Sequence, residues 1–96
     1  MEVSIRDKKI IVKHKVSVLA SVLSSCSLDN VDHRLNLIYS GAGFDDNGRG
    51  ISFWDESCEF NKDEIELYTP IEEVILSKEE LLKEVEEFEK QMKHLR

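Results

Sequence analysis

The clearest hydrophobic pattern lies at the C-terminal end of the chain. Apolar residues recur there at spacings of four, three, four and three, which places them on one helix face: Leu81, Val85, Phe88, Met92 and Leu95. Ser77 and Glu80 match a helix capping box, in which the Ser77 hydroxyl accepts a hydrogen bond from the Glu80 backbone N–H. The pattern therefore predicts a helix over residues 78–95.

The middle of the chain has the patterns of strands. Residues 64–68 alternate acidic and apolar side chains with a period of two, as in a strand with one buried face. Residues 50–54 and 71–76 are also β-prone, and turn-forming residues or the polar segment 55–63 separate the three runs. Three consecutive strands with such connections predict an antiparallel β-meander.

The first forty residues fit more than one arrangement. Apolar residues at positions 16, 19, 20 and 23 have helical spacing, so a helix over about 15–26 is favoured, with a hairpin through residues 3–12 as the alternative. A second helix is expected between residues 29 and 39. The whole pattern predicts an α+β fold in one domain over residues 1–96. It contains a meander of three or more strands, N-terminal helices and a long C-terminal helix.

Composition agrees with an ordinary globular domain. Of the 96 residues, 41% are hydrophobic and 34% are charged, and no stretch approaches the ~20 apolar residues that cross a membrane. The N-terminus also lacks the uninterrupted apolar run of a secretory signal. We therefore expect a cytoplasmic protein in which Cys26 and Cys58 are free thiols, although the two could pair.

The charge is concentrated in one part of the chain. The net charge is −7, and residues 55–89 contain three Lys or Arg against fourteen Asp or Glu, a local net charge of −11. Such a surface repels nucleic-acid phosphates and anionic membranes and attracts basic proteins. We expect no direct contact with nucleic acid or with a membrane.

Motifs for catalysis or metal binding are weak. Residues 45–56 match several positions of an EF-hand calcium loop, but Arg49 places a cation where a ligand oxygen belongs, so a glycine-containing hairpin loop is favoured. The three histidines lie in different predicted elements and lack metal-ligand spacing. Carboxylate pairs are frequent, and in so acidic a region they arise by chance. We expect no catalytic residue, metal or cofactor, and no enzymatic activity.

Acidic residues between positions 45 and 66 crowd around Phe53, Trp54 and Phe60. Charge of one sign beside aromatic side chains is typical of a surface that docks a basic protein, because charge steers the encounter and buried contacts slow dissociation. Trp54 could be such an anchor, but a core position is favoured because a small domain needs its largest side chain inside. The candidate partner-binding residues are Asp45, Asp46, Trp54, Asp55, Glu56, Glu59, Asp63, Glu64 and Glu66.

Four segments resemble a known protein family: SGAGF at 40–44, GISFWD at 50–55, EIELYTP at 64–70 and EVILS at 73–77. They resemble the bacterial immunity proteins that accompany ribonuclease toxins in contact-dependent growth inhibition systems. The resemblance covers about residues 40–82 and contains no catalytic motif. It implies a protein that binds the toxin domain and blocks its nuclease site, and it assigns no contact residues.

The sequence therefore predicts an immunity protein that neutralises a cognate ribonuclease toxin through its acidic surface. A ribonuclease cleft is usually basic because it attracts phosphate, and an acidic inhibitor can imitate that charge. A monomer is favoured over a homodimer in the free state. The alternative is a small structural or adaptor module that self-associates through the C-terminal helix, whose apolar stripe follows a heptad for only about two repeats.

Overall fold

The structure, a computed structural model, describes residues 1–96. The elements in chain order are β1 Glu2–Arg6, β2 Lys9–Lys13, α1 Ser17–Ser24, α2 Val31–Tyr39, β3 Phe44–Asp46, β4 Arg49–Phe53, β5 Glu64–Tyr68, β6 Glu73–Ser77 and α3 Lys78–Leu95. The strands β1 and β2 form a separate hairpin, and β3 to β6 form an antiparallel sheet in sequence order. The predicted α+β fold with a meander and a long C-terminal helix is confirmed.

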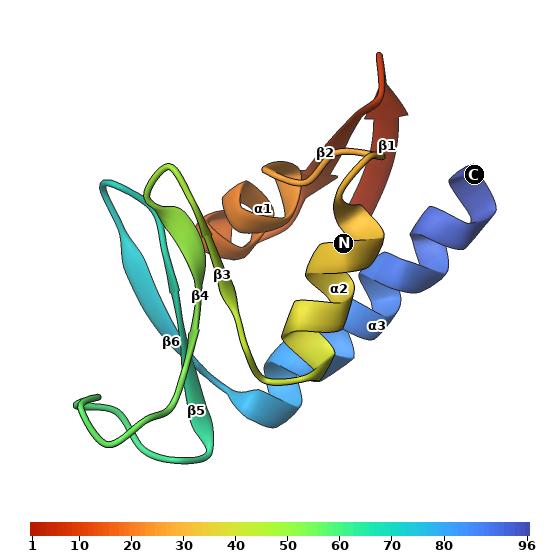
Figure 1. Cartoon of the computed structure of the whole chain (residues 1–96). Coiled ribbons are helices and arrows are strands. Elements are labelled where there is room, and N and C mark those ends of the chain that lie inside the picture. Colours follow the sequence, from red (N-terminus) through yellow and green to blue (C-terminus); the bar gives the residue numbers. More distant parts are fainter.

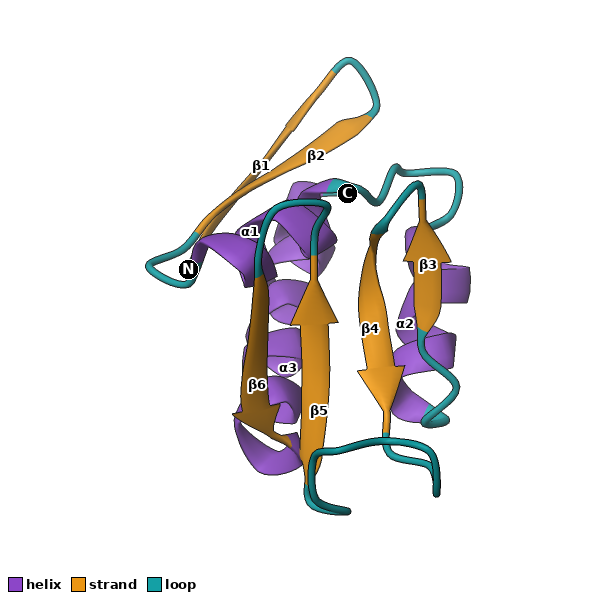
Figure 2. Cartoon of the chain, turned by 90° about the vertical axis from the view of Figure 1, so that its left-hand side faces the viewer, coloured by secondary structure: helices purple, strands orange, loops and turns teal.

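The four-stranded sheet has helices on one face only. Figure 1 shows the sheet at the left, with α2 and α3 on one side of it and the β1–β2 hairpin at the far end of the molecule. In Figure 2 the strands β3 to β6 lie in front and the helices lie behind them. The strand face turned away from the helices is therefore left uncovered by the rest of the chain.

One hydrophobic cluster connects both sheets and all three helices. The helix α3 contributes its predicted stripe, because Leu81, Val85, Phe88 and Met92 are each 0% exposed. Burying side chains of this size contributes about 1.5–3 kcal/mol each. Leu95, the last member of the stripe, is 45% exposed in the final turn. No helix, α3 included, is long and apolar enough to cross a membrane.

The N-terminal hairpin and the helix α1 both form, so treating them as alternatives was wrong. Their apolar patterns use different residues, and each pattern can fold without excluding the other. Asp7 and Lys8 form the hairpin turn with φ values of 52° and 66°, which a two-residue type I′ turn requires. The side chain of Gln91 in α3 then holds the hairpin, because it accepts from Val3 N at 3.0 Å and donates to Met1 O at 2.9 Å.

The start of α3 follows the predicted capping pattern. Ser77 Oγ accepts from Glu80 N at 3.1 Å, and this satisfies one of the N–H groups that a helix leaves free in its first turn. Ser77 is also the last residue of β6. The chain therefore passes from the sheet directly into the helix, and this junction sends α3 across the covered face.

The core position expected for Trp54 is wrong. Trp54 is half-buried just beyond the end of β4, and Lys62 Nζ lies 5.1 Å from the centre of its ring. Phe88 of α3 fills the centre of the core instead, so the domain has no need of the indole there. Trp54 is consequently placed at the end of the sheet, near the acidic β4–β5 loop. Cys26 is buried, Cys58 is half-buried, and both are free thiols.

Candidate protein-binding face

The uncovered side of the sheet is the most distinctive surface of the molecule. Ile51 in β4 and both Ile65 and Leu67 in β5 are buried on the helix side, so strand alternation directs their neighbours to the uncovered side. The strand register aligns these neighbours in rows across β3 to β6. We call this surface the acidic face, and its members are Asp45, Ser52, Glu64, Glu66, Tyr68, Glu73 and Ile75.

The acidic face contains carboxylates without any basic side chain. Its acidic members are Asp45, Glu64, Glu66 and Glu73. The ion pairs of the chain all lie elsewhere, between His14 and Glu84, Arg34 and Asp46, Lys83 and Glu79, and Arg96 and Asp32. The negative charge of the face is therefore not neutralised within the molecule.

Glu66 at the centre of this face shows the effect of that charge. Its partner in β6 is Ile75, so Glu73 lies on the same side, two residues away along the neighbouring strand. Partial burial and, secondarily, the charge of Glu73 raise the pKa of Glu66 above its ordinary value. A cation brought by a partner would favour the charged carboxylate and would be attracted by it in turn.

Tyr68 extends across β4 to the edge strand β3. Its hydroxyl donates to Asp45 Oδ2 at 2.7 Å. The ring passes over Gly50, where a Cβ would lie 2.7 Å from the Tyr68 hydroxyl oxygen and would overlap the carbonyl oxygen of Phe44. Burial of the phenol and the hydrogen bond to Asp45 raise the pKa of Tyr68 to about 12. Tyr68 is thus a fixed aromatic group on the acidic face, at the end of β5.

The β4–β5 loop continues the negative charge beyond one end of the sheet (Figure 2). Asp55 Oδ1 accepts from Ser57 N at 2.8 Å and from the Ser57 hydroxyl, and these hydrogen bonds lower the pKa of Asp55. At the other end of the loop, Glu64 Oε1 accepts from Asn61 N at 2.9 Å. These bonds give the loop a defined shape. Its remaining acidic residues are exposed and form no ion pair: Glu56, Glu59 and Asp63.

The structure brings together most of the predicted partner-binding residues and separates Asp46 from them. Asp45, Glu64 and Glu66 lie on the acidic face, and the others, Trp54, Asp55, Glu56, Glu59 and Asp63, lie in the loop at its end. Asp46 points to the opposite side of β3, where its Oδ2 is 3.0 Å from Arg34 Nη2. The Arg34 guanidinium also lies 4.9 Å from the centre of the Phe44 ring. Asp46 therefore connects β3 to α2.

Four members of the acidic face were missed in the sequence: Ser52, Tyr68, Glu73 and Ile75. Residues 64–68 and 73–77 both alternate with a period of two, and this signal assigns Tyr68 to the same side as Glu66. The contact of Tyr68 with Asp45 depends on strand register, which the sequence left open.

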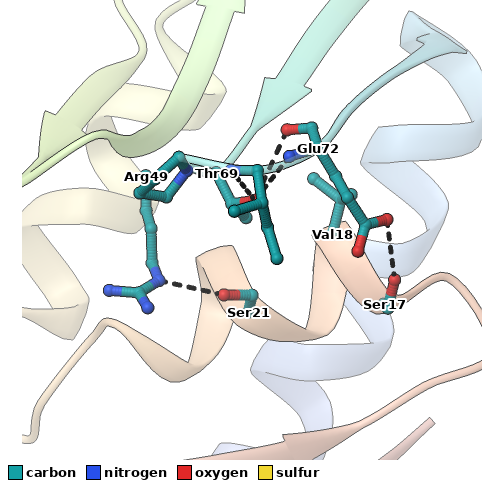
Figure 3. A pocket seen from close by; sticks show the side chains of 8 residues that line it. Ser17, Val18, Ser21, Arg49, Thr69 and Glu72 are labelled. Atoms are coloured by element: carbon teal, nitrogen blue, oxygen red, sulfur yellow. Dashed lines mark hydrogen bonds between the residues drawn. The ribbon is translucent and has the colours of Figure 1, made fainter.

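A separate polar pocket of about 300 Å³ lies between α1 and the β5–β6 turn (Figure 3). Arg49 Nε donates to Ser21 Oγ at 3.0 Å, and Ser17 Oγ donates to Glu72 Oε2 at 3.3 Å. The charged side chains that line the pocket, Arg49 and Glu72, are therefore both bonded to serines of α1. They attach the sheet to this helix.

His14 is the one histidine that is enclosed by the fold, with 6% of its side chain exposed. Its Nδ1 accepts from Val16 N at 2.9 Å, so the neutral ring has its proton on Nε2, which lies 3.0 Å from Glu84 Oε2. These bonds link the hairpin, α1 and α3. No group of three or more His, Cys, Asp or Glu side chains converges as a set of metal ligands.

Comparison of the chain with protein-family models, with curated proteins and with solved structures found no match. The resemblance of residues 40–82 to immunity proteins gains no support from these comparisons. We therefore infer the function of the chain from the geometry and charge of the acidic face.

Proposed function

We propose that the chain is a binding protein that docks a basic protein on its acidic face. Its partner in this proposal is a cognate ribonuclease toxin domain, which the chain neutralises as an immunity protein. The observation that supports the proposal most is that four carboxylates without cations share with the fixed ring of Tyr68 the uncovered face of the four-stranded sheet.

The physical basis is charge complementarity. A ribonuclease cleft presents cations to the phosphates of RNA, and the acidic face presents oxygens of the same charge. Electrostatic steering of this kind raises association rates by roughly 10–10³-fold. Inhibition needs only that the cleft is occupied, so the proposal requires no reaction on the chain itself.

In this proposal the apolar and aromatic members of the face make the buried contacts that slow dissociation of the complex. A hydrogen bond to Asp45 holds Tyr68 in place, and Ile75 of β6 is 39% exposed. Ordered aromatic side chains on a charged surface are typical of the few residues that carry most of the binding energy. Trp54 beside the loop is a second aromatic contact in this proposal.

The test uses the ribonuclease toxin domain that the proposal expects to be encoded beside this chain. Glu66→Lys combined with Glu73→Lys should weaken binding by about 100-fold or more and reduce the salt dependence of the affinity. The same variant should fail to inhibit RNA cleavage at concentrations where the wild-type chain inhibits it. Titration calorimetry and a cleavage assay measure the two effects.

The matched control changes the same amount of charge elsewhere. Asp29→Lys combined with Glu86→Lys alters two exposed acidic residues outside the acidic face. Its affinity should stay within about threefold of the wild type. If both double variants lost the same amount of affinity, the net charge of the chain, and not the acidic face, would control binding.

Self-association through the C-terminal helix is the alternative function expected from the sequence. The stripe of α3 that it requires is fully buried by the rest of the same chain. Only Leu95 of that stripe is exposed, and one side chain does not form a helix–helix interface.

A further inference from the structure

The strand β6 is an edge of the meander, and its outer side has no partner. It is the last strand in the sheet order, and Figure 2 shows no strand beside its outer edge, with α1 and α3 behind it. At the two ends of the β5–β6 ladder, Thr69 N donates to Glu72 O at 2.8 Å and Lys78 N donates to Asp63 O at 2.7 Å. Hydrogen-bonded and non-hydrogen-bonded pairs alternate in an antiparallel ladder. The peptide groups of Glu73 and Ile75 must therefore point outward, away from β5.

This edge lacks the usual protection against pairing. Natural edge strands are blunted by Lys, Pro, a bulge or short length. The register of β6 is regular over all five residues, and its three central residues are Val74, Ile75 and Leu76. Ile75 is 39% exposed and Ile71, just before the strand, is 87% exposed. An apolar, regular edge with free peptide groups is a template for another strand.

We propose that β6 pairs with β6 of a second copy of this chain. The two strands run antiparallel about a twofold axis at Ile75, and the two meanders join into one continuous sheet. Ile75 of one copy lies opposite Ile75 of the other, so the outward peptide groups of both strands meet. This is the one antiparallel register in which all five residues of β6 are paired.

Charge complementarity favours the same register. With Ile75 on the axis, Glu73 lies opposite Ser77. Just beyond the strand, Glu72 of the turn, which bonds to Ser17 in the single chain, lies opposite Lys78 of the other copy, the first residue of α3, twice by symmetry. A shift that centres the pairing on Glu73 would place two glutamates directly opposite each other, which is destabilising. The strand is therefore complementary to itself, and this argues for a second copy as the occupant of the edge.

The paired sheet leaves both acidic faces uncovered, so this inference does not rest on the proposed function. The two interactions also respond to salt in opposite directions. Docking of a basic protein weakens as salt is added, whereas pairing of two chains that each carry a net charge of −7 strengthens because their repulsion is screened. A five-residue edge buries little surface, so the dimer is expected to be weak and reversible.

The first experiment is analytical ultracentrifugation of the whole chain from about 10 µM to about 1 mM, at about 50 and 500 mM salt. The average mass should rise toward that of a dimer with concentration, and more so at high salt. Ile75→Lys places two ammonium groups at the axis and should weaken association by about tenfold or more. Ile11→Lys is the matched control, because Ile11 is 37% exposed on the hairpin and should associate as the wild type does.

A charge exchange tests the register. Lys78→Glu alone should weaken association, because a glutamate then faces Glu72 of the other copy. Adding Glu72→Lys restores opposite charges across the axis and should recover the wild-type association. Circular dichroism and thermal melts confirm that each variant is folded.

Three outcomes would overturn the proposal. The chain could stay monomeric over the whole range at high salt. The variants Ile75→Lys and Ile11→Lys could have the same effect, or the charge exchange could fail to restore what Lys78→Glu removed. Association that persists in Ile75→Lys would assign the contact to another surface.

Discussion

Gly50 determines the position of the largest side chain on the acidic face. Because it has no Cβ, the ring of Tyr68 can cross β4 and reach Asp45 in β3. The missing Cβ also lets β4 lie close to the carbonyl group of Phe44. One missing side chain thus permits both the packing of the strand edge and the shape of the proposed binding surface.

Gly50→Ala should therefore be strongly destabilising, by about 2–4 kcal/mol, because its Cβ has no room between the strands. Tyr68→Phe removes only the hydroxyl bonded to Asp45 and should cost about 1 kcal/mol. Urea denaturation measures both free energies of unfolding. A Gly50→Ala variant no less stable than Tyr68→Phe would show that the ring does not depend on this glycine.

Glu66 makes stability depend on pH. Its pKa is raised in the folded state, so the folded chain binds this proton more tightly than the unfolded chain does. The resulting stability is present at low pH and is lost as the pH rises through the folded-state pKa. At neutral pH the charged carboxylate therefore opposes folding.

Glu66→Gln should accordingly stabilise the fold at pH 7, by less than about 1 kcal/mol because solvent screens the charge. The difference between variant and wild type should disappear below about pH 4, where the wild-type carboxyl is protonated. Thermal melts at both pH values measure the difference, and Glu86→Gln on α3 serves as the control. If the wild type were as stable as Glu66→Gln at pH 7, the charged carboxylate of Glu66 would not oppose folding.

At the scale of elements, α3 holds the two sheets together. Its buried stripe packs in the common cluster with strands of the meander and of the hairpin, and Gln91 bonds to Met1 and to Val3 of β1. Its C-terminal turn reaches α2, where the Arg96 guanidinium donates two hydrogen bonds of 3.0 Å to Asp32. Removing volume from the middle of this helix should therefore affect the whole fold.

Two members of the same stripe provide a matched comparison. Phe88→Ala should cost about 3–5 kcal/mol because the side chain is fully buried at the centre of the core. Leu95→Ala should change stability by less than about 0.5 kcal/mol because Leu95 is 45% exposed. Chemical denaturation measures both values. Similar losses at the two positions would contradict the central role of Phe88.

The elements could be predicted from the sequence where their signals are local. The helix α3 has both a periodic stripe and a capping residue, and the strand β5 has a strict alternation, so both follow from neighbouring residues. The hairpin and α1 were treated as exclusive because each was judged without the tertiary contacts that hold both. The core position of Trp54 was wrong because the volume supplied by Phe88 of a distant helix decided it.

At the scale of the whole molecule, charge is divided between its two ends. The hairpin and its turn carry most of the basic residues of the N-terminal half, namely Arg6, Lys8, Lys9 and Lys13. Figure 1 places this hairpin away from the sheet, so its cations do not compensate the acidic face. The sequence indicated which third of the chain is acidic. It could not indicate which carboxylates share a surface, because that depends on which sheet face the helices cover.

The most direct test of the central claim is to map the surface that the proposed nuclease partner covers. Chemical-shift changes of the ¹⁵N-labelled chain, followed while the nuclease domain is added, report the contact residue by residue. The account predicts changes in β5, in β6 and in the β4–β5 loop, with the tip of the β1–β2 hairpin unaffected. Changes confined to the hairpin or to the outer surface of α2 and α3 would contradict it.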